Sequence, residues 1–144
     1  REALNAPGPI TPEDLVPTAD EATLEQRALK LERRPIEVEP KGIEKPEQTQ
    51  SSGKSFVRDP GVRAWVRQQA KGLCEGCGEP APFEKSGQPF LEVHHVKHLA
   101  QEGSDRPSNA VALCPNCHRR CHYSSDRDAF TASLYTNVKR LRAE

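Results

Sequence analysis

The sequence predicts an α+β fold, in which a small folded domain over residues 56–144 follows a mostly disordered linker over residues 1–55. Residues 1–55 carry seven of the thirteen prolines and no aromatic residue, whereas all five cysteines and all five histidines fall within residues 74–122. Hydrophobic residues make up only 34% of the chain. A typical globular domain has about 45–50% on a count that includes glycine, so part of the chain is expected to lie outside a core.

One segment of the linker, at about residues 18–33, has the pattern of a short helix. Leu24, Ala28 and Leu31 recur there with the i, i+4, i+7 spacing of a helix face. The residues that follow mix Pro, Glu, Lys, Gln and Ser with few apolar side chains, and such a composition buries too little surface to offset the entropy of ordering. We therefore expect a tether, which predicts a further domain on its far side, before residue 1.

The folded domain is expected to contain a helix, two strands and two further helices, in that order. Asp59-Pro60 is a helix-start signal, because Asp is a favoured N-cap and Pro a favoured first helical residue. Trp65 falls on the apolar face of this helix and is expected in the core. The other expected elements are strands at residues 90–96 and 110–113, a helix from residue 115 and a final helix over about residues 126–141.

Charge and hydropathy exclude several classes of protein. Lys plus Arg and Asp plus Glu both number 21, so the net charge alone indicates no partner. No run of about 18 apolar residues and no signal-peptide pattern occurs, so neither a membrane span nor secretion is predicted. Paired cysteines without a secretory signal favour metal binding in a reducing compartment, and we expect a cytoplasmic protein.

Two CxxC pairs predict a structural zinc site. Cys74 and Cys77 form the first pair, and Cys114 and Cys117 form the second. Two residues between cysteines allow both thiolates to reach one tetrahedral ion at about 2.3 Å, and four thiolates leave no open position for water. Such an ion contributes folding energy to a domain with a thin core. Cys121 is left over and receives no role.

The histidines predict a second site with a different task. His118 and His122 are spaced i, i+4, so they share one helix face and can bind one ion. His94 and His95 are neighbours on the expected strand and point to opposite faces. One of them can therefore bind the metal while the other acts as a base. This division suits phosphodiester hydrolysis, in which a neutral imidazole activates water and a cation stabilises the developing charge.

The order of His94-His95, Asn109 and His118, interleaved with the two CxxC pairs, resembles the HNH endonucleases of the ββα-metal fold. The resemblance covers about residues 59–123. Within it, the sequence is similar to the HNH modules at the C-terminus of modification-dependent restriction enzymes, in which a separate N-terminal module senses modified bases. The resemblance therefore implies a metal-dependent DNA endonuclease that leaves 5′-phosphate and 3′-hydroxyl ends.

The same resemblance implies a role for each residue of the second site. It makes His95 the general base, with Asn109 holding the loop and orienting His95 through a hydrogen bond. It makes His94, His118 and His122 the ligands of one catalytic cation. Because His94 stands where many family members have Asp, Mn, Ni, Co or Zn becomes as suitable as Mg. Candidate DNA contacts are the cations near the site, Arg119, Arg120, Arg106 and Lys97.

Several alternatives stay open at this level. A non-catalytic zinc-knuckle module that binds nucleic acid or protein would need the four cysteines but not the histidines and Asn109. A nuclease that acts on RNA fits the same residues. His98 is expected to be a surface residue of a loop. A double-strand cut would require a homodimer or two successive nicks, since each site has one metal and one base.

Overall fold

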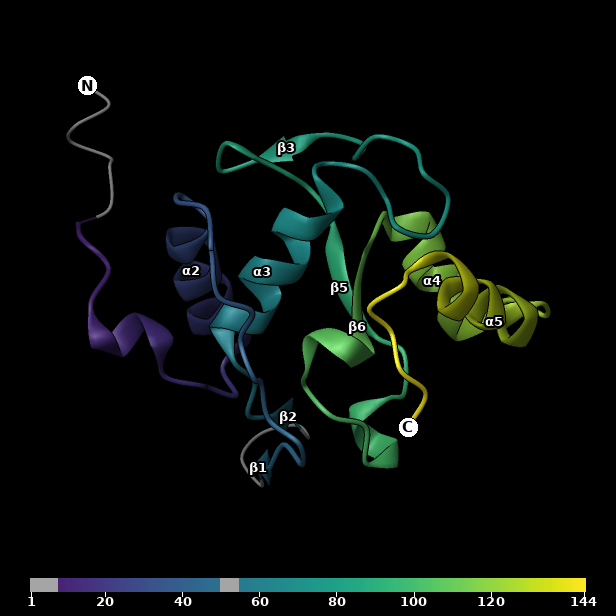
Figure 1. The fold of residues 1–144 in the computed structure, drawn as a ribbon, viewed down its shortest axis with the longest axis horizontal. Helices are drawn as coiled ribbons and strands as arrows, with labels where there is room; N and C mark the ends of the chain where they lie inside the picture. Colours follow the sequence, from purple (N-terminus) through teal and green to yellow (C-terminus); the bar gives the residue numbers. More distant parts are fainter. Residues whose placement is uncertain (1–7, 50–54) are drawn as a thin grey trace.

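The computed structural model describes residues 8–49 and 55–144, and its elements form layers around a short antiparallel sheet (Figure 1). The helices are α2 (Glu21–Leu31), α3 (Pro60–Ala70), α4 (Pro115–Tyr123) and α5 (Arg127–Asn137), with 3-10 turns η1 (Pro12–Leu15), η2 (Leu99–Gln101) and η3 (Pro107–Asn109). The strands are β1 (Gln48–Thr49), β2 (Ser55–Phe56), β3 (Glu84–Lys85), β4 (Gln88–Pro89), β5 (Glu92–His95) and β6 (Ala110–Leu113). This mixture confirms the expected α+β class.

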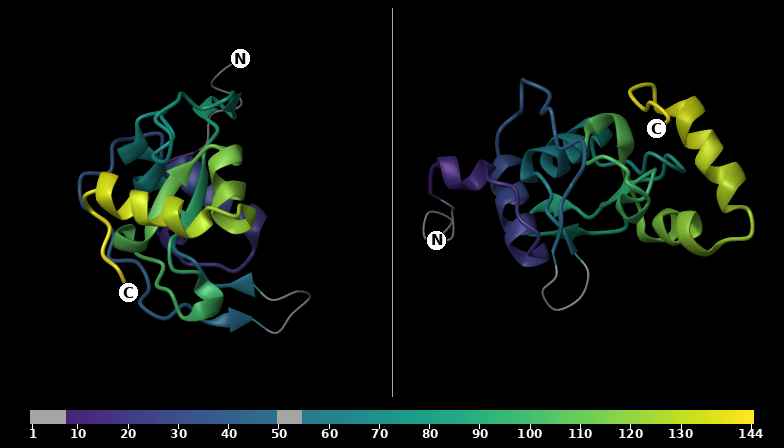
Figure 2. Two further views of the ribbon diagram at one scale, coloured as in Figure 1. Left: turned by 90° about the vertical axis from the view of Figure 1, so that its right-hand side faces the viewer. Right: turned by 90° about the horizontal axis from the view of Figure 1, so that it is seen from below.

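The pair β5–β6 is the centre of the layers. The two strands are antiparallel, with Glu92 opposite Leu113 and His95 opposite Ala110. Helix α3 packs on one side of the pair with α2 outside it, and α4 followed by α5 lies on the other side (Figure 1). Figure 2 shows the same order from below, with α2 and α5 at opposite ends. The arrangement of β5, β6 and α4 brings His94 of the strand next to the histidines of the helix.

The main core joins α3, the strand pair and α5. Strand β6 is buried along its whole length, because it is covered by helices on both faces. Trp65 is 9% exposed and belongs to this core, as expected from the sequence. The other large buried side chains of the cluster are Val62, Val66, Leu91, Val111, Leu113, Phe130 and Leu134. The core therefore holds the sheet between two helical layers and fixes β5 against α4.

The N-terminal segment contains the short helix expected at about residues 18–33, and this helix packs on the folded domain. Helix α2 is present and is capped by Asp20, whose side chain accepts the N–H of Thr23 at 2.9 Å. Its apolar stripe of Leu24, Ala28 and Leu31 is buried, part of it against Ala64 of α3. The composition of the segment did not predict this packing, because composition counts only the apolar residues of the segment itself. The apolar surface that covers the α2 stripe lies on α3. Residues 1–7 and 50–54, where disorder was also expected, lie outside the described residues.

Ion pairs reinforce the contact between α2 and α3. Arg63 binds both Glu21 and Glu25, at 2.7 and 2.9 Å. Arg67 binds Glu25 at 2.8 Å and Glu32 at 3.0 Å, and both arginine side chains are only 12% exposed. Charges that form a network are a stronger stability argument than isolated surface pairs. Glu21, Glu25 and Glu32 therefore have partners on the folded domain.

The last helix ends at Asn137, four residues before the expected end. Val138 has an extended conformation, yet Val138 and Leu141 stay buried, so the apolar spacing continues without the helix. The chain leaves the helix where Arg140 binds the Glu75 carboxylate at 2.7 and 2.8 Å and the Ala110 carbonyl at 2.8 Å. Among the described helices, none has the length and apolar character needed to cross a membrane.

Candidate active site and metal sites

The four cysteines of the CxxC pairs come together, as the spacing predicts. The Sγ atoms of Cys74, Cys77, Cys114 and Cys117 all lie within 4.8 Å of one another. Cys114 is the N-cap residue of α4 and Cys117 lies in its first turn, so the helix start positions this pair. Four thiolates at this separation fit one tetrahedral zinc ion.

Backbone N–H groups also favour the thiolate form in this cluster. The N–H groups of Gly76 and Cys77 point at Sγ of Cys74, at 3.3 and 3.4 Å. Burial raises the pKa of Cys74, but hydrogen bonds from Cys114, Cys77 and Gly76 outweigh it and lower the pKa to about 7. Cys121 lies outside this group of ligands and is buried, and burial raises its pKa to about 11. Cys121 is therefore a packed thiol.

Three histidines from two elements form the second cluster. His94 of β5 and His118 and His122 of α4 offer ring nitrogens within 4.8 Å of one another. His94 is buried at 2% exposure, whereas His122 is exposed, so the cluster opens to solvent on the helix side. Three imidazoles on one side of an accessible space fit a divalent transition metal with positions left for water or substrate.

A carboxylate and the neighbouring rings set the state of these imidazoles. Oε1 of Glu92 lies 2.9 Å from Nδ1 of His118, and Nε2 of His118 lies 3.2 Å from Nε2 of His122. Burial, followed by the charges of His118 and His122, lowers the pKa of His94 to about 3. Burial also lowers the pKa of His122. The buried imidazole of His94 is therefore neutral near pH 7, the form that could bind a metal ion.

His95 points to the other face of β5, as the strand alternation predicts. Its Nε2 lies 2.8 Å from Oδ1 of Asp105, and its side chain is 14% exposed. Asp105 is buried at 2% exposure and was not singled out in the sequence, because an acid in a turn-rich loop carries no distinguishing signal. The structure thus separates a cluster of three histidines on one face from a histidine–aspartate pair on the other.

Asn109 closes the loop after His95, as expected, but it does not bond to His95. Its Oδ1 accepts the N–H of Lys97 at 2.8 Å, and its Nδ2 donates to the carbonyls of Lys97 and Ser104 at 3.0 and 2.8 Å. The expectation of a hydrogen bond from Asn109 to His95 is wrong, because the buried Asn109 amide bonds to Lys97 and Ser104. The carboxylate of Asp105 holds the His95 ring instead.

His98 lies beside the cluster of three histidines and not at an isolated surface position. Its ring centroid lies 4.9 Å from that of His122 and 5.7 Å from that of His94, and the residue is half-buried. The start of η2 directs it there, since His98 is the N-cap of that turn. Sequence spacing alone could not place it, because the turn reverses the chain after β5.

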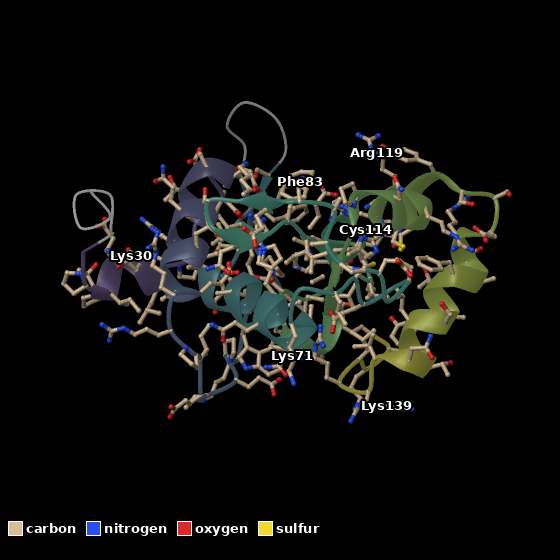
Figure 3. The ribbon with its side chains drawn as sticks, turned by 90° about the horizontal axis from the view of Figure 1, so that it is seen from above. Lys30, Lys71, Phe83, Cys114, Arg119 and Lys139 are labelled. Carbon is tan, nitrogen blue, oxygen red and sulfur yellow. The ribbon has the colours of Figure 1, made fainter. Side chains whose placement is uncertain are left out.

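The four candidate DNA-binding cations differ in their surroundings. Arg119 is exposed and projects from α4 away from the body of the molecule (Figure 3). Arg120 binds Asp126 at 2.6 Å and stacks on Phe130, 4.2 Å from the ring centroid. The other two are Arg106, which binds Glu44 at 2.9 Å, and Lys97, which is half-buried in the loop that Asn109 closes.

Comparison with known proteins identifies the central region. A family model described as HNH endonuclease matches residues 74–124, the stretch that contains both clusters. Residues 74–124 are an HNH endonuclease domain. Both CxxC pairs of this HNH domain, the His94-His95 doublet and the histidines of α4 lie within the matched range, which confirms the resemblance inferred from the sequence.

Similarity to known restriction enzymes extends beyond the HNH domain. The chain is 47% identical over 127 residues to the type IV methyl-directed restriction enzyme EcoKMcrA of Escherichia coli (strain K12), covering 88% of this chain and 46% of the relative. It is also similar to the structure of the type IV phosphorothioation-dependent restriction endonuclease ScoMcrA, with 31% identity and a TM-score of 0.54. That match covers 83% of this chain and 23% of the other. The chain thus spans less than half of either protein.

Proposed function

We propose that this chain is the cleavage module of a modification-dependent restriction enzyme and that it hydrolyses DNA phosphodiester bonds to 5′-phosphate and 3′-hydroxyl ends. The observation that carries the proposal is the division of β5 into two faces. His94 joins two imidazoles of α4 on one face, and His95 stands beside Asp105 on the other. A module that only binds nucleic acid or protein would not need the pair of His95 and Asp105.

In this proposal, the three clustered histidines, His94, His118 and His122, would hold one divalent cation, Mg, Mn, Ni, Co or Zn. When bound, the cation supplies Lewis-acid stabilisation of the phosphorane charge and of the leaving oxygen. His95 takes the proton from the attacking water, as a neutral imidazole can near pH 7. Asn109 keeps the loop behind His95 closed through its three hydrogen bonds to Lys97 and Ser104. The four cysteines would hold a structural zinc.

The partner of this module is DNA, and we propose that its specificity comes from elsewhere in a longer protein. The relatives are described as methyl-directed and phosphorothioation-dependent, and the matched regions are 46% and 23% of their lengths. A modification-sensing domain before residue 1 is consistent with this. One metal and one base per site cut one strand, so we propose a homodimer for double-strand cleavage. Four zinc-binding thiolates suit a reducing compartment, the cytoplasm.

We further propose that residues 56–144 are the nuclease domain and that residues 8–49 are an extension docked on it. The docked extension is supported by the buried stripe of α2 and by the ion pairs of Arg63 and Arg67. An anchored extension would hold a sensing domain in a fixed position relative to the catalytic cluster, which a free tether would not do.

A plasmid-nicking assay tests the proposed function. Supercoiled DNA with and without base modification is incubated with the chain and with Mg, Mn, Ni or Zn supplied separately. We expect nicking with at least one metal, and a loss of roughly 100-fold or more in the His95→Ala variant, since a general base contributes about 10²–10⁴-fold. The exposed Lys139→Ala variant is the matched control and should cut like the wild type.

Two outcomes would overturn parts of the proposal. Equal cutting by His95→Ala and wild type would remove His95 as the base. An absence of nicking with every metal, on modified as well as unmodified DNA, would favour the zinc-knuckle binding module. Replacement of the plasmid by single-stranded RNA in the same assay separates a DNA nuclease from an RNA nuclease.

A further inference from the structure

Asp105 is a buried acid whose two carboxylate oxygens both have partners. Its side chain is only 3% exposed. Oδ1 lies 2.8 Å from Nε2 of His95, and Oδ2 accepts the backbone N–H of Asp59 at 2.6 Å. The N–H of Asp59 belongs to the N-cap residue of α3, which is fixed in the core. Asp105 is therefore a rigid link between a core helix and His95.

The backbone of Asp105 is held as firmly as its side chain. Its N–H donates to the carbonyl of Ile43 at 2.7 Å, and its carbonyl accepts the N–H of Ile43 at 2.9 Å, so the two residues form an isolated antiparallel bridge. Asn109 fastens the same loop from beneath by its bond to the Ser104 carbonyl. The loop after β5 is thus anchored on three sides, and the carboxylate has little freedom to turn away from His95.

The contact with Asp105 selects one tautomer of His95. An ionised carboxylate can only accept hydrogen bonds, so Nε2 of His95 must carry the proton that points to Oδ1. In a neutral imidazole the other nitrogen, Nδ1, then has a free lone pair. The carboxylate also restrains rotation of the ring. A base needs both features, an unprotonated nitrogen and a fixed direction.

We propose that Asp105 is the positioning residue of the HNH domain, which binds Nε2–H of His95 and thereby presents Nδ1 to the attacking water. This inference rests on the proposed function of His95 as the base. Asp105 does not touch the DNA or the cation in this account; it acts only through His95. Its second bond, to the N–H of Asp59, restrains the carboxylate beside the imidazole.

A purely structural role is the competing explanation, since Asp105 also joins the loop to α3. The two explanations predict different results. If Asp105 only stabilises the loop, its removal lowers the melting temperature and leaves the His95 tautomer unchanged. If it positions His95, its removal redistributes the proton between Nδ1 and Nε2 and lowers kcat, while KM for DNA stays the same.

The experiment compares Asp105→Asn, Asp105→Ala and Ser104→Ala in the full, zinc-loaded chain. Ser104 is the matched control, because it is the neighbouring loop residue, is as deeply buried, and bonds through its side chain to Glu144 and not to His95. Nitrogen-15 NMR of the histidine rings at a fixed pH of about 8 reports the tautomer without any need for catalysis. The nicking assay on supercoiled plasmid reports kcat and KM.

For the wild type we expect His95 as the Nε2–H tautomer. In Asp105→Ala we expect a mixture of tautomers and a kcat lowered roughly 10- to 1,000-fold, a smaller loss than the 10²–10⁴-fold expected when the base itself is removed. Asp105→Asn, which keeps the shape and can still accept one bond, should lie between the two. Ser104→Ala should keep the tautomer and kcat of the wild type.

An unchanged tautomer and an unchanged kcat in folded Asp105→Ala would overturn the inference. So would a loss of kcat in Ser104→Ala as large as that in Asp105→Ala, because loop loosening alone would then explain the effect. Asp105→Asn serves if Asp105→Ala does not fold. The NMR result is independent of cleavage, so a chain that never cuts DNA but shows the Nε2–H tautomer would count against the proposed function and not against the contact.

Discussion

Glu92 and His118 are joined by a 2.9 Å contact between Oε1 and Nδ1, which restrains the imidazole ring. A carboxylate on Nδ1–H leaves Nε2 free, and Nε2 is the nitrogen that faces His122 at 3.2 Å. Carboxylate partners of this kind fix the tautomer of a metal-binding histidine and raise its basicity. Glu92 lies on the same face of β5 as His94, so in the proposed metal site one strand would provide a ligand and the support of a second ligand.

Replacement of Glu92 is therefore expected to weaken binding of the catalytic cation. Glu92→Ala should lower the affinity about 10- to 100-fold, and Glu92→Gln by less, because the amide oxygen can still accept the Nδ1–H bond. Calorimetric titration with Mn or Ni measures the effect. Glu84→Ala, an exposed acid on β3, is the control. Equal affinities in wild type and Glu92→Ala would show that the contact does not support the metal site.

Removal of the structural zinc should unfold the HNH domain. The site joins the knuckle at residues 74–77 to the start of α4, and a structural zinc can contribute about 10–16 kcal/mol of apparent binding energy at pH 7. We expect a chelator, or Cys117→Ala, to abolish the near-ultraviolet circular dichroism of the domain. Cys121→Ala should retain one equivalent of zinc by elemental analysis, since Cys121 is not among the ligands. Zinc loss in Cys121→Ala would contradict the assignment of the four cysteines.

The residues of both sites could be predicted from the sequence, because local periodicity determines which side chains share a face of a strand or helix. Strand alternation separates His94 from His95, and helix spacing pairs His118 with His122. The CxxC spacing is equally local. Each of these relationships needs only the type of the element, and all of them hold in the structure.

The remaining features depend on contacts between distant residues. Asp105 binds Asp59 across 46 positions, and Arg67 binds Glu25 across 42. No periodicity in the sequence indicates such pairs. The docking of the N-terminal helix could not be predicted for the same reason, because α2 has its apolar partner on another helix. Long-range packing thus explains most of the differences between what the sequence predicted and what the structure contains.

Arg119 and Arg120 are neighbours whose replacement should have different effects on DNA binding. No ion pair of Arg119 is found within residues 8–49 and 55–144, whereas Arg120 is held by Asp126 and Phe130. Arg119→Ala should weaken DNA binding and lower the slope of log K against log salt by about one. Arg120→Ala should leave that slope unchanged and lower the melting temperature. Fluorescence anisotropy at several salt concentrations measures both slopes, and equal slopes for the two variants would contradict the prediction.

Glu32 should make the stability of the chain depend on pH. Its side chain is 4% exposed and lies 3.0 Å from Arg67. Burial raises its pKa from 4.5 to about 7, although Arg67 opposes the shift. Between these two values the folded state keeps the proton and the unfolded state releases it. The protonated Glu32 therefore makes its full contribution to the free energy of unfolding below pH 4.5. This contribution is lost as the pH rises towards 7.

The Glu32→Gln variant isolates this contribution. Relative to the wild type, its free energy of unfolding should gain on the order of 1–3 kcal/mol between pH 4.5 and pH 7, because the amide does not titrate. Urea denaturation at a series of pH values measures the difference. Glu37→Gln, an exposed neighbour, should follow the wild type. A constant difference between Glu32→Gln and the wild type would show that Glu32 keeps its charge beside Arg67.

Gly42 is the position at which the N-terminal extension meets the loop of Asp105. Its φ of +73° lies in the left-handed region, and a Cβ there would stand 2.0 Å from the Asp105 carbonyl oxygen. Gly42→Ala should therefore break the bridge between Ile43 and Asp105. We expect a loss of about 1–3 kcal/mol in the free energy of unfolding, the range for a strained backbone position. Gly8→Ala is the control, because no atom lies within 4 Å of the Cβ that the substitution would add.

The same variant tests whether the extension acts on catalysis through Asp105. If the bridge helps to hold the carboxylate against His95, Gly42→Ala should lower kcat as well as stability, with KM for DNA unchanged. If the bond from the Asp59 N–H suffices, stability falls alone and kcat in the folded variant equals that of the wild type. A fall in kcat would mean that displacement of the N-terminal extension can reach the base, since residues 42 and 43 contact Asp105 directly.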